Sequence, residues 1–238
     1  MSPALDLDLL LKAYAIGVFP MADDRDADEI YWVEPKRRAI LPLDGFHLAR
    51  SLRKTLASGR YETSFNRAFH DVVRQCAAPA ADRPGTWINR QIEDAVVRLH
   101  ALGHAHSIET WADGELVGGL YGLSLGRAFF GESMFSRAPN ASKVALAHLV
   151  ARLRAGGFEL LDCQFQTPHL QSLGAIEISG ADYSVRLGAA LSASGPSAAA
   201  SGDLSALDAL LPDGAPRAST VSGPTSAWRI LQALTQTS

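Results

Sequence analysis

The first third of the chain shows both helical and extended patterns of apolar residues. Apolar side chains recur at helical spacing over residues 5–16, where we predict a short helix. Two short apolar runs bounded by prolines predict edge strands, at residues 31–33 and 39–41. Two amphipathic helices follow, separated by an extended segment, at residues 48–56 and 69–76. These elements predict a small mixed N-terminal α/β domain over residues 1–88.

The pattern after residue 88 predicts a second, larger domain. Asn89 is a suitable N-cap for a helix that ends at Gly103. Alternating apolar and polar positions around the hairpin signal Asp113-Gly114 predict three consecutive antiparallel strands over residues 106–136. The remaining elements are expected in this order: a helix at residues 140–155, a buried strand at 158–164, a short helix near 170 and a last strand at 183–187.

This order, β-β-β-α-β-α-β, is that of the acetyltransferase (GNAT) fold. We therefore predict the α+β class, with a GNAT-like domain over residues 89–188 built on a mainly antiparallel sheet. Residues 189–202 contain only Ala, Leu, Ser, Gly and Pro, which is typical of a linker. We interpret residues 189–238 as a linker and a tail with short helices after Asp203 and around Trp228, and expect the chain cut after Gly188 to remain active.

Charge and composition exclude several classes of protein. The 238 residues include 22 Lys and Arg against 25 Asp and Glu, so nucleic acid could be bound only through a local basic patch. No apolar run reaches the about 18 residues of a membrane span, and we expect a cytoplasmic protein without a membrane anchor. Cys76 and Cys163 lie far apart, which fits a reducing compartment. The three histidines at positions 100, 104 and 106 are interrupted by Gly103, so we expect no metal site.

Residues 129–137 form the most unusual segment of the chain, because a carboxylate interrupts an aromatic strand. On a regular strand, Glu132 shares one face with Phe130, Met134 and Ser136, so its carboxylate would lie beside an apolar surface. Such a surface suits a ligand that has both a charged amine and an apolar side chain. The alternative is a core strand whose glutamate pairs with a nearby arginine.

A second pair of polar residues ends the predicted central strand. Asp162 and Gln164 are two residues apart and share one face of a regular strand. A carboxylate and an amide at a strand end can hold and orient an attacking amine. The alternative is a helix cap or a loop hydrogen bond. Cys163 would point to the opposite side, as a buried structural cysteine.

Cationic and aromatic side chains in the first domain suggest contacts with nucleic acid. Four cations lie on and just beyond one predicted helix: Arg50, Arg53, Lys54 and Arg60. They could contact phosphates, although a solvated helix face is the ordinary alternative. Trp32 and Trp87 lie near turns, where each could stack on a base or a ribose or serve in packing.

Several sequence blocks follow one another over residues 7–187. They include Gly85-Thr86-Trp87-Ile88, Gly103-His104-Ala105-His106-Ser107-Ile108-Glu109, Gly118-Gly119-Leu120-Tyr121-Gly122, Gly131-Glu132-Ser133-Met134-Phe135-Ser136, Asn140-Ala141-Ser142-Lys143 and Asp162-Cys163-Gln164. In this order the blocks resemble the leucyl/phenylalanyl-tRNA–protein transferase family. The resemblance departs at Met21 and Val33, where the family has tryptophans, and it does not extend to the tail.

The resemblance implies an activity, partners and site residues. The implied reaction transfers Leu or Phe, and less readily Met, from aminoacyl-tRNA to a protein that begins with Arg or Lys, which creates a degradation signal. Asp162 and Gln164 would serve the attacking amine, and Glu132 would lie near the aminoacyl group. Met134 and Leu120 would line the side-chain pocket, while Trp32 and Trp87 would hold the tRNA 3′ end. No cofactor is needed, because the aminoacyl ester is already activated, and we expect a monomer.

Two other functions remain open from the sequence. An acyl-CoA N-acyltransferase shares the strand order, but the turn Arg137-Ala138-Pro139-Asn140-Ala141-Ser142-Lys143 has no glycine, and its proline has no N–H for a pyrophosphate. A protein that only binds basic N-termini could use Glu132 and Asp162 as countercharges. Aminoacyl-tRNA would leave the melting temperature of such a binder unchanged.

Overall fold

The computed structural model describes residues 4–79, 85–192, 201–209, 222–225 and 227–235. The helices are α1 (Leu7–Ala15), α2 (Arg50–Ala57), α3 (Phe69–Ala77), α4 (Arg90–Ala101), α5 (Ala141–Ala155), α6 (Pro168–Gln171), α7 (Gly180–Ser192), α8 (Ala206–Ala209) and α9 (Ala227–Thr235), with a 3-10 turn at Leu43–Gly45. The strands are β1 (Phe19–Met21), β2 (Tyr31–Val33), β3 (Arg37–Ile40), β4 (Glu62–Phe65), β5 (Ala105–Ala112), β6 (Glu115–Leu125), β7 (Ala128–Ser136), β8 (Leu160–Gln164), β9 (Ile176–Ser179) and β10 (Ser222–Thr225).

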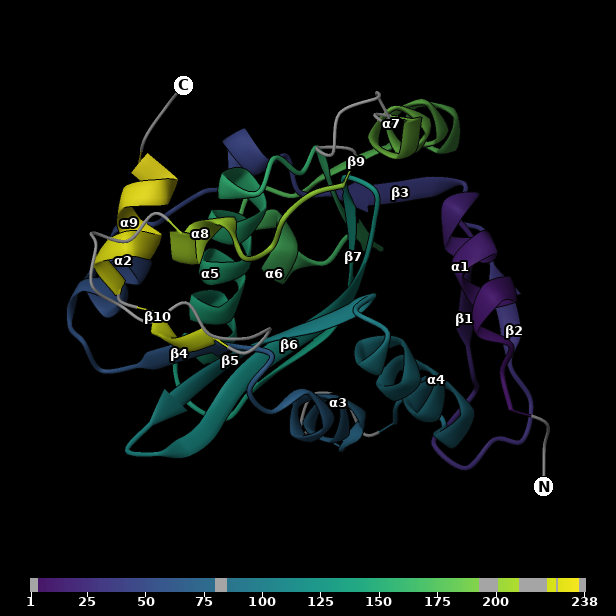
Figure 1. Cartoon of the computed structure of the whole chain (residues 1–238), viewed down its shortest axis with the longest axis horizontal. Helices are drawn as coiled ribbons and strands as arrows, with labels where there is room; N and C mark the ends of the chain where they lie inside the picture. The colour runs from purple at the N-terminus through teal and green to yellow at the C-terminus, as the bar shows by residue number, and fades with distance from the viewer. Residues whose placement is uncertain (1–3, 80–84, 193–200, 210–221, 226, 236–238) are drawn as a thin grey trace.

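One large sheet organises the molecule. Its eight strands follow the order β10-β4-β5-β6-β7-β8-β3-β9, and β1 and β2 form a separate antiparallel hairpin (Figure 1). Within the described residues, β7 and β8 are the one parallel pair, and α5 is the crossover helix that connects them. The α+β class and the mainly antiparallel sheet are therefore confirmed.

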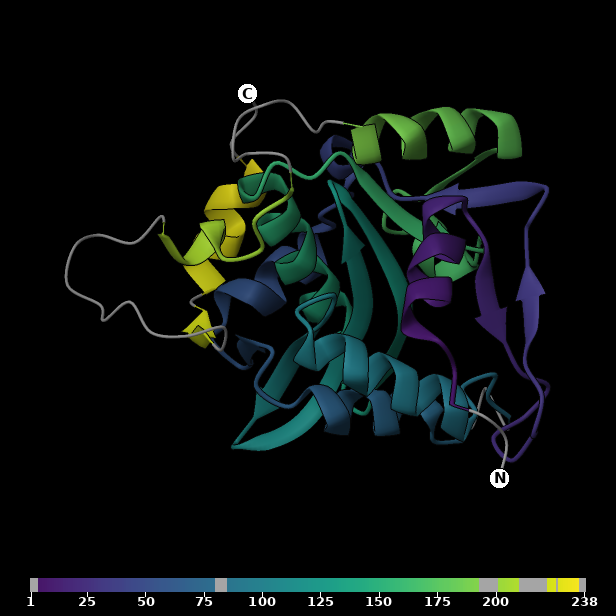
Figure 2. The same cartoon turned by 45° about the vertical axis from the view of Figure 1, so that its right-hand side comes forward.

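Helices cover both faces of the sheet and enclose two apolar clusters. One cluster contains buried side chains of α2, α5, α8 and α9, and the other contains those of α1, α3, α4 and α7. The turned view in Figure 2 shows α3 and α4 side by side on one face, with α5 on the other. Within the described residues, no helix is both long enough and apolar enough to cross a bilayer.

Several local predictions are confirmed in atomic detail. The Asn89 side chain accepts a hydrogen bond from the Ile92 N–H and caps α4. Asp113 and Gly114 both have positive φ, 51° and 81°, as the two central residues of a type I′ hairpin turn require. The strands β5, β6 and β7 pair in the predicted antiparallel order.

Two strand predictions were wrong. The run at residues 39–41 is not an edge strand, because β3 lies between β8 and β9. Residues 183–187 belong to α7, and the strand that precedes this helix is β9, at Ile176–Ser179. The buried side chains of α7 are Tyr183, Leu187 and Ala190, which is helical spacing, whereas β9 is too short and exposed to produce a clear alternation.

The domain boundary expected at residue 88 divides the strands of a single sheet. β3 and β4 precede it in the chain, yet both are hydrogen-bonded into the sheet that contains β5 to β9. α1 and the two-stranded hairpin β1–β2, which precede β3, contribute no strand to this sheet (Figure 1). The chain segment before β3 is therefore the most separate part of the first third.

The body does not end at Gly188. α7 continues to Ser192, β10 pairs with β4, and α9 packs on α5 and α2. The Arg152 side chain of α5 is fully buried and makes two hydrogen bonds to Asp208, at 2.8 Å each, and one to the Leu204 carbonyl. The tail therefore completes one of the two apolar clusters. Residues 193–200 of the predicted linker lie outside the described residues, as does the side chain of Trp228.

Candidate active site

A cavity of about 450 Å³ opens where β7 and β8 separate. The two strands pair only from Ala128 to Phe130 and from Leu160 to Asp162, so the residues beyond are free to line a space. The lining residues are Phe19, Met21, Trp87, Leu120, Tyr121, Gly131, Glu132, Ser133, Met134, Leu146, Leu149, Leu161, Cys163, Gln164, Phe165, Thr167, His169 and Leu170. Five predicted site residues are thereby brought together: Trp87, Leu120, Glu132, Met134 and Gln164.

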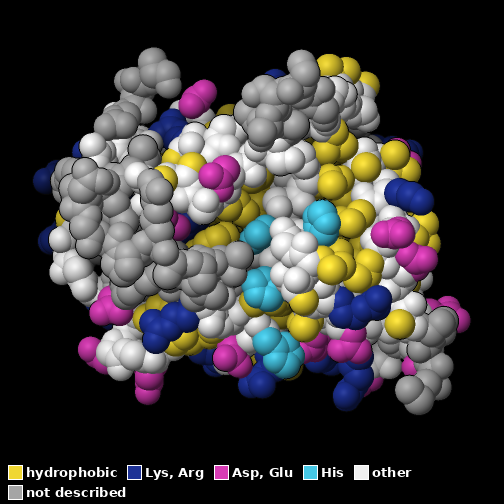
Figure 3. All heavy atoms as spheres, viewed as in Figure 1, with side chains coloured by type: hydrophobic (Ala, Val, Ile, Leu, Met, Phe, Trp, Pro, Cys, Tyr) yellow, Lys and Arg dark blue, Asp and Glu magenta, His cyan; other side chains and the backbone are white. Residues whose placement is uncertain are grey.

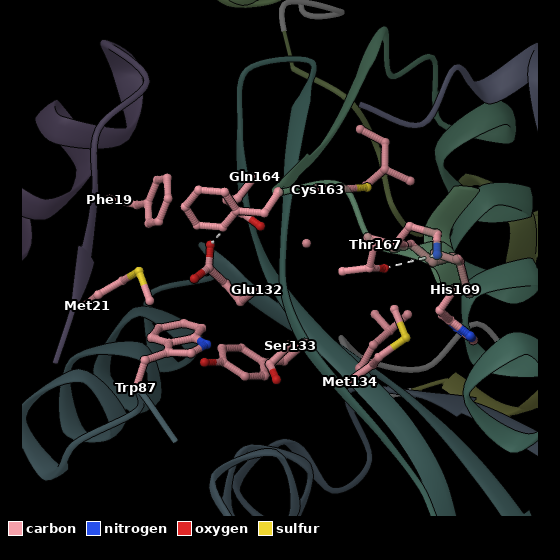
Figure 4. A pocket seen from close by; sticks show the side chains of 18 residues that line it. Phe19, Met21, Trp87, Glu132, Ser133, Met134, Cys163, Gln164, Thr167 and His169 are labelled. Atoms are coloured by element: carbon pink, nitrogen blue, oxygen red, sulfur yellow. Dashed lines mark hydrogen bonds between the residues drawn. The ribbon is translucent and has the colours of Figure 1, made fainter. Parts of the chain in front are cut away.

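The cavity has two ends of different character (Figure 4). Phe19, Met21 and Trp87 form one end, which we call the aromatic end. Met134 lies at the opposite end with Leu120, Leu149 and Leu161, which share one apolar cluster, and we call this the apolar end. Glu132 and Gln164 point toward one another between them (Figure 4). On the molecular surface, Figure 3 shows histidines near the centre of one face, beside exposed apolar side chains.

A β-bulge aims Glu132 into the cavity. Tyr121 pairs with Ser133 and Gly122 pairs with Gly131, so Glu132 is the extra residue of β7. A side chain at position 122 would lie 2.2 Å from the Phe130 carbonyl oxygen, which explains the glycine there. Because of the bulge, the prediction that Glu132 and Phe130 share one face of the strand was wrong. Gly131, Glu132, Ser133 and Met134 all line the cavity, whereas Phe130 is buried in the core.

Glu132 is held between two polar side chains. It hydrogen-bonds the Tyr14 hydroxyl, and its Oε1 accepts a hydrogen bond of 3.3 Å from Nε2 of Gln164. Burial raises the pKa of Glu132 to about 8, and the Tyr14 hydrogen bond opposes this shift only in part. The carboxyl group can therefore lose its proton when a cation enters the cavity.

Asp162 does not line the cavity. Its side chain is fully buried behind the wall, where Arg38 donates to Oδ1 and Oδ2 at 2.9 and 2.5 Å. The Tyr183 hydroxyl donates to Oδ2, and the backbone N–H of Gln164 donates to Oδ1, both at 2.9 Å. Gln164 has a left-handed backbone with φ 55°, so strand alternation ends at this residue. Its side chain enters the cavity beside Cys163, which was expected to point away.

The contacts of Cys163, His100 and His106 indicate structural roles for these residues. Burial raises the pKa of the Cys163 thiol well above its usual range, so it is a poor nucleophile at neutral pH. His100 stacks on Phe69 with ring centroids 4.1 Å apart, and His106 contacts Asn66 and Ser124. These contacts use the histidines as packing and hydrogen-bonding groups.

Trp32 lies outside the cavity, and Met21 lines the cavity at the end where Trp32 was expected. In the β1–β2 hairpin, Trp32 pairs with Pro20, while Met21 pairs with Tyr31. Paired residues share a face, so Trp32 faces away from the side that carries Phe19 and Met21. Met21 therefore lies near Trp87 (Figure 4), and the Ala22 N–H donates to the Trp87 carbonyl.

Ser136 lies in a neighbouring groove of about 930 Å³ that shares Met134 and His169 with the cavity. The Ser136 hydroxyl accepts a hydrogen bond from the Ser142 N–H at the start of α5. The groove also contains two cationic side chains, Arg137 and Lys143. The four cations predicted from the sequence, Arg50, Arg53, Lys54 and Arg60, are exposed on and just beyond α2 and line neither space.

Sequence reasoning missed two buried partners of the site, Arg38 and Tyr183. Arg38 ends the run Lys36-Arg37-Arg38, which looks like an exposed basic segment. Tyr183 was assigned to a strand, so its approach to Asp162 from α7 could not be foreseen. For neither residue did the sequence carry a signal of contact with Asp162.

Replacing Glu132 by Gln should stabilise the protein more at about pH 8.5 than at about pH 5.5. Between the ordinary carboxyl pKa and about 8, folded Glu132 retains a proton that the unfolded chain has released. The wild type therefore loses stability as the pH rises through this window, and the glutamine variant lacks this loss. Melting temperatures of both proteins at the two pH values test this. An equal difference at both would contradict the raised pKa.

Comparisons with known proteins point to one family. Residues 40–188 match the family model described as leucyl/phenylalanyl-tRNA protein transferase, and residues 4–36 match the model of its N-terminal domain. A leucyl/phenylalanyl-tRNA–protein transferase of Rhizorhabdus wittichii is 60% identical over 248 residues, which cover 99% of each chain. The one of Zymomonas mobilis is 60% identical over 81% of this chain and 72% of its own.

Two of the solved structures that match are distant in sequence, at 14% identity. The structure of L-PGS from Bacillus licheniformis is 14% identical and has a TM-score of 0.40 over 69% of this chain and 55% of that one, so it carries no argument about the site. A family model that covers most of the body, and relatives at 60% identity, are decisive. The chain belongs to the leucyl/phenylalanyl-tRNA–protein transferases, enzymes that transfer leucine or phenylalanine from tRNA to proteins.

Proposed function

We propose that the enzyme transfers Leu or Phe, and less readily Met, from aminoacyl-tRNA to proteins that begin with Arg or Lys. The product carries a new N-terminal residue that serves as a degradation signal. One observation carries the proposal: a single cavity joins an aromatic end, a carboxylate–amide pair and an apolar end (Figure 4). The proposal takes the enzyme to be a monomer that acts in the cytoplasm, where charged tRNA is found.

The two ends of the cavity suit the two parts of the aminoacyl 3′ end. Trp87 and Met21 offer flat and polarisable surfaces for the terminal adenine. The apolar end, with Leu120 and Met134, suits the leucyl or phenylalanyl side chain. Ile and Val carry their bulk next to the backbone, so we expect them to fit this end less well. In this pose the ester lies between the ends, beside Gln164 and Glu132.

Gln164 is the side chain best placed to orient the acceptor amine. Its Nε2 donates to Glu132, which leaves its Oε1 as an acceptor for an amine proton. A protein α-amine has a pKa of about 7.7–8.0, so part of it is neutral at pH 7 and can attack the ester carbonyl. The new N–C bond forms as the ester C–O bond breaks, and the proton leaves with the tRNA 3′-oxygen. Orientation supplies much of the catalysis.

Glu132 gives the cavity its preference for a cationic acceptor. A cation near the carboxyl favours its ionised form, which lowers the raised pKa and creates an attractive charge. The basic side chain or the α-ammonium of the acceptor supplies this cation. The proposal therefore assigns Glu132 to recognition and Gln164 to orientation.

Replacing Leu120 by Val, or Met134 by Leu, should change the ratio of Leu to Phe transfer. One methylene in an apolar pocket is worth about 1–3 kcal/mol, so ratios should shift about 10-fold or more. The measurement compares kcat/KM with Leu-tRNA and Phe-tRNA for each variant. Leu102, which is exposed on the surface, provides the matched control as Leu102→Val. An equal loss with both donors would mean that Leu120 and Met134 serve only in packing.

Reversing Arg50, Arg53 and Lys54 to Glu should raise the KM for aminoacyl-tRNA and reduce its salt dependence. These exposed cations of α2 can contact a few phosphates, and each lost contact lowers the salt slope by about 0.7–0.9. Lys12 and Arg186, exposed on α1 and α7, provide a control with the same type of change. If KM and salt slope stay at the wild-type values, the α2 cations are merely solvated.

Transfer of label from tRNA to protein tests the proposed function. We expect radiolabelled leucine to pass from Leu-tRNA to a model protein that begins with Arg, and not to the same protein beginning with Ala or acetylated at its N-terminus. A protein that only binds basic N-termini would transfer no label. It would also keep its melting temperature when aminoacyl-tRNA is added.

A further inference from the structure

A buried ion pair lies directly behind the amide that faces the cavity. Arg38 and Asp162 are 1% and 0% exposed, and two hydrogen bonds join them. Removing two charges from water is costly, and such a pair is tolerated where its remaining hydrogen-bonding groups are also satisfied. Here Arg38 has further contacts on one side, and Asp162 has further donors on the other.

Arg38 connects the two walls of the cavity. Its Nη1 donates to the Gly17 carbonyl at 2.8 Å, just before β1. The guanidinium lies 4.8 Å from the Phe19 ring centre and 4.4 Å from that of Tyr183. Through Asp162 the same side chain reaches β8, so one planar cation sets the position of Phe19 relative to Gln164.

The acceptor capacity of Asp162 is fully used. Oδ1 accepts from Nε of Arg38 and from the Gln164 N–H, and Oδ2 accepts from Nη2 of Arg38 and from the Tyr183 hydroxyl. The carboxylate does not line the cavity. A general base must be within hydrogen-bonding distance of the proton that it removes, directly or through one water. Asp162 has neither the access nor a free lone pair for this role.

The hydrogen bond that the Gln164 N–H donates to Asp162 fixes an unusual backbone. Gln164 has φ 55°, in the left-handed region, which a residue with a side chain adopts only when its surroundings determine it. This conformation turns the Gln164 side chain into the cavity beside Cys163, instead of leaving it on the Asp162 face. The direction of the catalytic amide therefore depends on Asp162.

We propose that Arg38 and Tyr183 are positioning residues, which hold Asp162 so that it fixes the backbone and direction of Gln164. Asp162 then acts through Gln164 and takes up no proton from the amine. This inference rests on the proposed role of Gln164 toward the acceptor amine. It places three buried residues of β3, β8 and α7 behind one residue that touches the substrate.

Replacing Tyr183 by Phe separates positioning from proton transfer. The change removes one donor to Asp162 and keeps the ring over Arg38. With positioning, the single-turnover rate at saturating Leu-tRNA falls about 3- to 10-fold, the KM for tRNA stays constant, and the pH profile keeps its midpoint. If Asp162 were the base, removing a donor from its carboxylate would shift the midpoint of the pH profile. That shift would overturn the proposal.

Tyr61→Phe is the matched control, because it also removes one hydrogen bond, to the Pro139 carbonyl, away from the cavity. We expect it to keep the wild-type single-turnover rate. An equal fall in both variants would show a general effect of stability and contradict a specific role of Tyr183. Absence of transfer by the wild type would instead refute the proposed function.

A double replacement gives the second test. Asp162→Asn alone leaves the buried Arg38 charge without its partner, whereas Arg38→Gln with Asp162→Asn keeps a neutral pair and an oxygen that can accept from the Gln164 N–H. We expect the double variant to exceed Asp162→Asn in single-turnover rate by about 10-fold or more and to recover its melting temperature. A double variant that regains stability and remains as slow as Asp162→Asn would overturn the inference.

Discussion

Replacing Gln164 by Ala should lower the single-turnover rate of transfer about 100-fold. The amide is the polar side chain between the two ends of the cavity whose oxygen is left to accept from an amine, once its nitrogen has donated to Glu132. Without it the acceptor amine loses its orientation, and a misplacement of about 1 Å costs a factor on this scale. The KM for Leu-tRNA should stay within about 3-fold, because the apolar and aromatic ends remain intact.

Gln91→Ala serves as the control for this change. Gln91 is partly exposed on α4, where its side chain donates to the Asp28 carbonyl. This variant should transfer leucine at the wild-type rate. A folded Gln164→Ala enzyme with the wild-type single-turnover rate would remove Gln164 from the chemical step, and a large rise in KM alone would reassign it to donor binding.

Ending the chain at Ser192 should lower the melting temperature by more than about 10 °C. The cut removes Asp208 from the fully buried Arg152, and breaking such a pair costs about 3–5 kcal/mol. It also removes the buried side chains of Leu207 and Ile230 from the cluster around α5. For a chain of this size, each kcal/mol corresponds to about 2–4 °C. Thermal unfolding followed by circular dichroism measures the effect.

A compensating substitution shows whether the ion pair causes the loss. Arg152→Met in the shortened chain removes the buried charge, so it should recover several degrees, whereas the same change in the full chain should destabilise it. The sequence-based expectation that the tail is dispensable for activity is tested separately, by the transfer activity of the chain ending at Ser192. An unchanged melting temperature would show that α8 and α9 contribute little.

The regular parts of the fold could be predicted, because each depends on local signals. Asn89 caps α4, and Asp113-Gly114 closes the hairpin between β5 and β6, as the sequence indicates. Apolar patterning also placed the three antiparallel strands and the crossover helix in their order. These features need only nearest neighbours along the chain or across a hairpin.

The site itself depends on departures from regularity. Period-two alternation placed Glu132 with Phe130, and Asp162 with Gln164, whereas the bulge at Glu132 and the left-handed backbone of Gln164 reverse these groupings. The left-handed backbone of Gln164 is held by Asp162, which is in turn held by the distant Arg38, and the bulge at Glu132 requires a glycine at position 122, against the Phe130 carbonyl of the neighbouring strand. A pattern along the chain cannot contain such contacts.

The tail was predicted only in part: its two short helices are present as α8 and α9, whereas their packing on the body was not foreseen. Its many small residues are typical of a linker, yet a few larger side chains among them, such as Leu204 and Leu207, are buried. Their binding site is the surface of α5, where Arg152 and Arg154 donate to groups of the tail. The overall composition does not reveal these few buried side chains, so it underestimates how much of the segment is folded.

A crystal structure with a stable donor analogue would test the account most directly. Leucyl-adenosine with an amide in place of the ester keeps the adenine, the ribose and the leucyl group but cannot react. We predict its adenine against Trp87 and Met21, its leucyl side chain between Leu120 and Met134, and its carbonyl group beside Gln164. An analogue bound in the groove of Arg137 and Lys143, or one with its leucyl group outside the apolar end, would contradict the assignment of the cavity.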